Sequence, residues 1–165
     1  MEVQLRKHQN MLVIIGSGVM SFGMWSAIKM VLYSMMRRSE FRETIAEQGA
    51  SEDIQGVLLI IMYLFIGIGL AFILALRSYI GLSARAEGMG KKRGNGYIIA
   101  ASLLTLVDTL IFAVVAYYSF TAPQSIDDLL DRIVSGVVEL TSLVTLAELV
   151  YSAIRVRQLT RALSE

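Results

Sequence analysis

The sequence predicts an all-α integral membrane protein, a four-helix bundle whose two termini lie on the same side of the bilayer. Three observations predict it. Hydrophobic residues make up 55% of the 165 residues, whereas an average soluble domain has about 45–50%. These residues fall in four long blocks, and most basic residues lie outside the blocks, on one side of the expected membrane.

Each block is long enough to cross a bilayer, because a hydrocarbon core of ~30 Å takes about 20 helical residues. Helices are expected rather than strands, since "GVLLIIMYLFIGIGLAFILAL" lacks the alternation of a barrel strand. The connections are short, so the whole chain, residues 1–165, is expected to form a single four-span domain. The blocks run approximately over residues 11–36, 56–80, 97–120 and 133–154.

The first block could be mistaken for a signal peptide, because Arg6 and Lys7 precede its apolar run. A signal core is about 7–15 residues long and ends at a cleavage site. Here the apolar run continues to Met36. We therefore predict a retained first span.

The segment between the first two blocks, residues 37–53, is rich in charges. Phe41 and Ile45 are four residues apart within it, a spacing that places both on one helical face. This pattern predicts either a short amphipathic helix on the outer surface or an extension of the first span.

The distribution of charge predicts the orientation. Ten of the 15 Lys and Arg residues lie in the N-terminal tail, at the inner end of the second block and in the loop that follows it, and in the C-terminal tail. Acidic residues lean towards the other side. Cytoplasmic segments carry the excess of Lys and Arg, so both termini are expected to face the cytoplasm. The expected location is a bacterial cytoplasmic membrane.

The basic loop "GMGKKRGNG", residues 88–96, contains glycines and cations as phosphate-binding loops do. It matches neither the P-loop pattern nor the dinucleotide-binding pattern, and no strand precedes it. We interpret it as a loop on the positive side of the membrane. Lys91, Lys92 and Arg93 are expected to contact anionic lipid headgroups.

A row of small residues marks the second block. Gly67, Ala71 and Ala75 follow one another at intervals of four, and such rows let helix backbones approach closely in lipid. We predict a packing face here, within the bundle or between subunits. The many small and hydroxyl residues of the other blocks fit either tight packing or a polar-lined cavity.

Two of the four charged residues that lie deep within the blocks form the best candidate for an ion pair. Lys29 lies about 12 Å and Glu139 about 10 Å from the outer ends of their spans, at 1.5 Å per residue. An unpaired charge at a helix centre costs roughly 2.5–3.5 kcal/mol. A Lys29–Glu139 pair would join the first and fourth spans.

The other two, Asp108 and Glu148, have no opposite charge at their own depth. Asp108 lies near the middle of the third block and Glu148 about 10 Å from the inner end of the fourth. Such a carboxylate can take up a proton, accept hydrogen bonds from Ser or Thr, or bind a cation. Asp108 is therefore either a structural residue bonded to a hydroxyl or, with Glu148, part of a proton or cation pathway.

Several kinds of chemistry are excluded or disfavoured. The chain has no cysteine and one histidine, His8, which excludes disulfides, thiolate metal sites and thiol catalysis. A net charge of +1 predicts no nucleic-acid partner. We expect no catalytic residue, no metal, no cofactor and no enzymatic activity.

Two functions remain open from the sequence. One is an oligomeric channel or transporter for a cation, a proton or a small solute, using the intramembrane carboxylates. The other is a non-catalytic accessory or scaffold subunit that stabilises a partner membrane protein. The expected partners are the lipid bilayer and either further copies of the chain or a partner membrane subunit.

Overall fold

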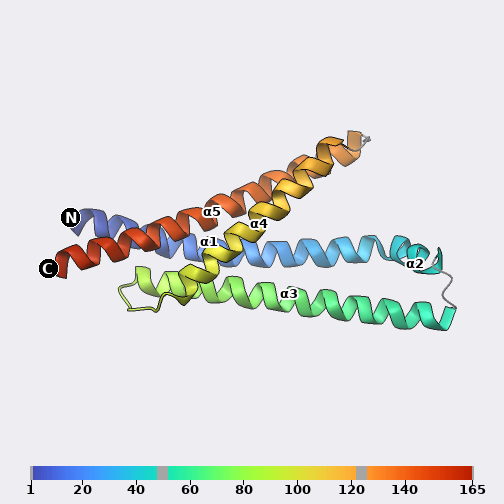
Figure 1. Ribbon diagram of the computed structural model, residues 1–165, viewed down its shortest axis with the longest axis horizontal. Coiled ribbons are helices and arrows are strands. Elements are labelled where there is room, and N and C mark those ends of the chain that lie inside the picture. The colour runs from blue at the N-terminus through green and yellow to red at the C-terminus, as the bar shows by residue number, and fades with distance from the viewer. Residues whose placement is uncertain (1, 48–51, 122–125, 165) are drawn as a thin grey trace. The chain divides into compact units, whose positions relative to one another are not determined.

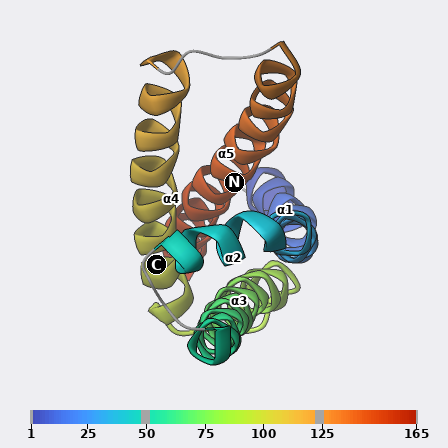
Figure 2. The same ribbon diagram turned by 90° about the vertical axis from the view of Figure 1, so that its right-hand side faces the viewer.

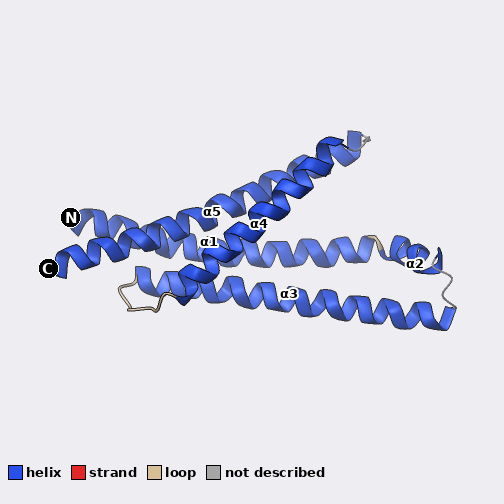
Figure 3. Cartoon of the chain, in the orientation of Figure 1, coloured by secondary structure: helices blue, strands red, loops and turns tan. Residues whose placement is uncertain are grey.

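The computed structural model describes residues 2–47, 52–121 and 126–164, which form helices and no strand (Figures 1 and 3). The all-α fold class predicted from the sequence is therefore confirmed. The helices of the described residues are α1 (Glu2–Met36), α2 (Arg38–Glu47), α3 (Glu52–Gly88), α4 (Gly96–Thr121) and α5 (Ile126–Ser164).

Four of the described helices are long and apolar enough to cross a membrane, as the four blocks predict. The candidate spans are Glu2–Met36, Ile54–Gly88, Gly96–Tyr117 and Ser135–Leu163. Three of the helices run well beyond the predicted blocks. A helix of 35 residues such as α1 is about 52 Å long at 1.5 Å per residue, more than the ~30 Å hydrocarbon core requires.

The charged segment was predicted to form either a short amphipathic helix or an extension of the first span, and α2 has features of both. Its backbone continues from α1, since the Phe41 N–H donates to the Arg37 carbonyl at 3.1 Å and the Arg37 N–H to the Tyr33 carbonyl at 3.0 Å. Figure 2 shows that α2 nevertheless turns away from the axis of α1. Phe41 and Ile45 are half-buried, so α2 is a short amphipathic helix that follows α1 without a loop.

The chain divides into two compact units. The boundaries between them fall within α1 and within α3, so each of these helices contributes to both units. The first unit comprises Met1–Met20 with Ser78–Glu165, and the second comprises Ser21–Arg77. That all four spans form a single domain stays a prediction. The largest fully buried side chains all belong to the first unit, where α4 and α5 pack together. They are Leu12, Val19, Ile80, Tyr97, Leu146, Leu149 and Ser152.

In the first unit, α1 and α3 are in backbone contact at glycines. A Cβ atom added to Gly81 would lie 2.5 Å from the Gly16 carbonyl oxygen, and one added to Gly16 would lie 2.7 Å from the Gly81 carbonyl oxygen. A Cβ on Gly88 would lie 2.6 Å from the Gln9 carbonyl oxygen. No side chain fits at these positions, which is the close approach that small residues permit between membrane helices.

The predicted packing face lies elsewhere on α3. Gly67, Ala71 and Ala75 are exposed, and a Cβ on Gly67 would meet no atom of the described residues within 4 Å. Whether this row packs within the bundle or between subunits stays a prediction.

The second unit has its own contacts between α1 and α3. The Tyr63 hydroxyl donates a hydrogen bond to the Ser34 carbonyl oxygen at 3.2 Å. The buried Arg77 side chain lies across Gly23, where an added Cβ would be 3.0 Å from the arginine Cδ. A glycine and the aliphatic part of an arginine thus bring the two helices together.

The glycine contact predicts opposite effects of one substitution at two positions of α3. Gly81→Ala should lower the free energy of unfolding by about 1–3 kcal/mol, the usual cost of overpacking. Gly69→Ala, where the added Cβ meets nothing within 4 Å, should be neutral or stabilising because alanine favours helix. Unfolding of the detergent-solubilised protein by denaturing detergent measures both. Equal effects at the two sites would contradict the contact.

Candidate functional site

Helix α3 ends in a glycine cap that sets the direction of the basic loop. Gly90 has a φ of 81°, a left-handed conformation that glycine adopts without strain. Its N–H donates to the Glu87 carbonyl at 2.9 Å, and the Lys91 N–H donates to the Ala86 carbonyl at 3.0 Å. This is the bond pattern of a Schellman cap, and it gives Lys91 and the following residues a defined start.

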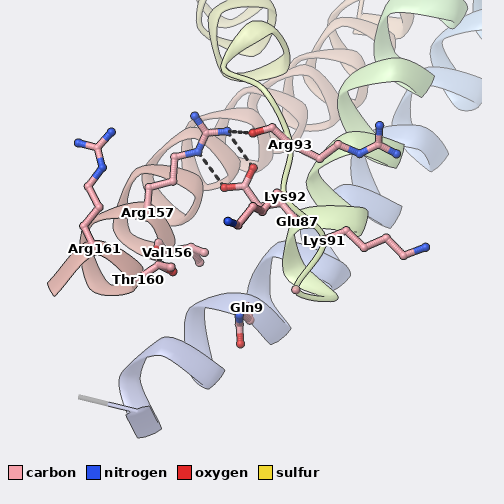
Figure 4. Close-up of a pocket in the computed structure, with 10 residues that line it drawn as sticks. Gln9, Glu87, Lys91, Lys92, Arg93, Val156, Arg157, Thr160 and Arg161 are labelled. Carbon is pink, nitrogen blue, oxygen red and sulfur yellow. Dashed lines mark hydrogen bonds and ion pairs between the residues drawn. The ribbon is translucent and has the colours of Figure 1, made fainter. Parts of the chain in front are cut away.

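Arg157 of α5 holds this loop in place. Its Nε donates to Glu87 Oε1 at 2.8 Å and its Nη2 to Glu87 Oε2 at 2.9 Å, which makes the ion pair bidentate. Nη2 also bonds the carbonyl oxygens of Arg93 at 3.2 Å and Gly94 at 3.1 Å, and Nη1 bonds Asn95 Oδ1. We call Arg157, Glu87 and these loop acceptors the arginine clamp; part of it is drawn in Figure 4.

The clamp is largely shielded from water. The side chain of Glu87 is 9% exposed and that of Arg157 is 23% exposed. The guanidinium carbon also lies 5.7 Å from the ring centroid of the buried Tyr97, within the range of a cation–π interaction. An exposed ion pair contributes about 0–1 kcal/mol to the stability of a protein. Removing one partner of a buried pair leaves an uncompensated charge, which lowers stability by much more.

A cavity of about 380 Å³ lies beside the clamp (Figure 4). Helix α1, the α3–α4 loop and α5 all contribute to its walls. Five of the side chains that line it are cationic and one is acidic, so it favours anions. That acid is Glu87, which is already paired with Arg157. The lining residues are Gln9, Glu87, Gly90, Lys91, Lys92, Arg93, Val156, Arg157, Thr160 and Arg161.

The structure brings the three predicted headgroup residues to one place. Lys91, Lys92 and Arg93 all line the cavity. No local sequence pattern predicts that Arg157 and Glu87 meet, because they are 70 residues apart. The only hint was an acidic residue in a segment that is otherwise basic.

The two predicted proton or cation residues differ in exposure. Asp108 of α4 is half-buried, whereas Glu148 of α5 is exposed. Both belong to the first unit. Whether either binds a proton or a cation stays a prediction.

The threonines near these carboxylates bond to their own helices. Each hydroxyl has one proton to donate, and each donates it to a carbonyl one turn earlier, as threonine commonly does within helices. The four bonds run from Thr105 to Ala101 at 2.8 Å, from Thr109 to Thr105 at 2.6 Å, from Thr141 to Val137 at 2.7 Å and from Thr145 to Thr141 at 2.7 Å. These hydroxyls therefore have hydrogen-bond acceptors within their own helices.

The predicted Lys29–Glu139 ion pair would join the two units. Lys29 is an exposed residue of the second unit, and Glu139 is a half-buried residue of the first. The pair stays a prediction.

The chain matches no family model, and comparison with curated proteins and with solved structures finds no match. Its four apolar helices are those of a membrane protein. Within the described part of the chain, no three His, Cys, Asp or Glu side chains are grouped to hold a metal ion.

The clamp predicts unequal effects for two neighbouring arginines of α5. Arg157→Ala should lower the free energy of unfolding by roughly 3 kcal/mol, because Glu87 is left as a buried unpaired charge. It should also expose the loop to trypsin, which cleaves after Lys and Arg. Arg155→Ala removes an exposed arginine whose hydrogen bonds to described residues are to Tyr151 and Gln158 of its own helix. It should change stability by less than about 0.5 kcal/mol.

Chemical unfolding and limited proteolysis in detergent measure the two consequences. The Arg157→Lys variant keeps the charge but loses the bidentate geometry, so we expect it to fall between the wild type and Arg157→Ala. The same loop cleavage rate in all variants would show that the clamp does not hold the loop.

Proposed function

We propose that the protein is a non-catalytic membrane scaffold subunit that works as a homo-oligomer. Glu148 carries this proposal. It is exposed on α5 and has no hydrogen-bond or ion-pair partner among the residues that the structure describes. Ionisable residues within membranes face protein or water, and exposure to acyl chains costs roughly 2.5–3.5 kcal/mol at the centre of a span. A neighbouring copy of the chain would cover it.

The row of small residues on α3 supports the same proposal. Gly67, Ala71 and Ala75 form an exposed strip along the helix, and the most apolar stretch of α3 contains no buried residue. Lipid covers apolar side chains well, but a glycine leaves a notch in the helix surface. That notch stabilises packing most when the backbone of another helix enters it. A second copy is the favoured occupant, because closed symmetric assemblies of identical chains are the commonest oligomers.

Transport of protons or small cations is the second candidate function. One observation favours it: Asp108 and Glu148 lie on α4 and α5, two helices that pack together in the first unit. Intramembrane carboxylates on adjacent helices are a common arrangement in proton and cation pathways. In an oligomer, Glu148 would then line a path between copies.

The scaffold proposal predicts that substitutions at exposed positions weaken self-association. Glu148→Leu should raise the dissociation constant of the oligomer about tenfold or more, equal to about 1.4 kcal/mol, because the need to cover a carboxylate disappears. Gly67→Leu should do the same by filling the notch. Gly69→Leu is the matched control, since it is equally open but faces another direction. Light scattering and cross-linking in detergent and in nanodiscs measure association, and a monomeric wild type would overturn the proposal.

The transport candidate predicts a measurable proton or cation flux. Purified protein in liposomes containing a pH-sensitive or cation-sensitive dye should dissipate an imposed gradient. Asp108→Asn and Glu148→Gln, which remove the charge but keep the shape, should reduce the flux to that of empty liposomes. Absence of flux in an assembled wild-type protein would leave the scaffold function and exclude transport of the ions tested.

A further inference from the structure

We propose that the basic cavity beside the arginine clamp binds the phosphate group of an anionic phospholipid. The proposal is independent of the oligomeric state. It joins three observations: a hollow of about 380 Å³, an excess of cationic side chains around it, and its level relative to the ends of the spans.

The excess of positive charge is not cancelled within the cavity. Glu87 is its one acidic lining residue, and both oxygens of that carboxylate already accept bonds from Arg157. Lys91 and Lys92 form no ion pair with any residue that the structure describes. Since anions are drawn to hollows lined by one sign of charge, a phosphate group is the ligand that this lining suits.

Lys92 is the residue placed to contact the phosphate directly. In Figure 4 its side chain extends towards α5, on the side of Val156, whereas those of Lys91 and Arg93 extend away from α5. Gln9 on the opposite wall offers a neutral amide donor. The hydroxyl of Thr160 already donates to the Val156 carbonyl at 2.7 Å, so it can only accept.

The level of the cavity favours a lipid phosphate over a soluble one. The apolar block within α3 ends near residue 80, and the block within α4 begins near residue 97. Gly90 to Arg93 therefore lie beyond the ends of both apolar blocks, on the side where lipid headgroups are expected. Basic pockets between membrane helices bind anionic headgroups, and the exposed Ile99 and Leu103 of α4 offer apolar surface for an acyl chain.

Lys92→Gln tests the site, because the side chain is exposed and its loss leaves the clamp intact. Lys7→Gln is the matched control. Lys7 lines a different hollow of the first unit, with Gln4, His8, Arg155 and Leu159. The solubilised full-length protein would be titrated separately with phosphatidylglycerol, phosphatidylcholine and inorganic phosphate, and bound molecules counted by native mass spectrometry.

The wild type should bind phosphatidylglycerol in preference to phosphatidylcholine, and inorganic phosphate much more weakly than either. Lys92→Gln should weaken phosphatidylglycerol binding about fivefold, the effect of one cation near an anionic surface, whereas Lys7→Gln should change it less than about twofold. Equal losses in the two variants would mean diffuse surface attraction and overturn the site. Phosphate binding as tight as that of the lipid would show a soluble ligand and overturn the choice of a lipid.

Discussion

The ion pair between Arg157 and Glu87 is the interaction on which the basic end of the first unit depends. It joins the last turns of α5 to the last turn of α3, and the same guanidinium bonds the loop through Arg93, Gly94 and Asn95. An arginine can do this because its planar group carries five donors in a fixed geometry. Without it, the loop would keep its glycine cap but lose its attachment to α5, and the cavity would lose a wall.

The glycine contact between α1 and α3 complements the clamp. Gly88 meets the backbone of Gln9 one residue after Glu87, so the segment that forms the ion pair also rests directly on α1. The close approach begins deeper, at Gly16 and Gly81. This explains why α1 starts well before its apolar block: its first turns have a helix to pack against, and tertiary packing rather than propensity supplies most helical stability.

The fold could be predicted from the sequence, because hydrocarbon imposes a length and a composition that are visible in any span. The side of each helix that packs could not. Gly67 and Gly81 both lie on α3 with small residues nearby, and spacing alone does not say which row meets α1, since lipid and apolar side chains are equally good cover. The Arg157–Glu87 pair could not be predicted from the sequence either, because its residues are 70 apart and no local pattern links them. Only the clustering of Lys91, Lys92 and Arg93 followed from the sequence.

Glu87 and Glu148 differ in whether the chain itself compensates the cost of placing a carboxylate near or within the membrane. Glu87 lies where the span ends and receives two charge-assisted bonds from Arg157, so its burial is compensated within the chain. Glu148 is exposed on its span, and the nearby Thr145 donates its proton to its own helix. The roughly 2.5–3.5 kcal/mol cost of such an exposure is a large part of the 5–15 kcal/mol that stabilises a typical protein. In the proposed oligomer, covering a carboxylate of that cost by association would favour assembly by up to about a hundredfold.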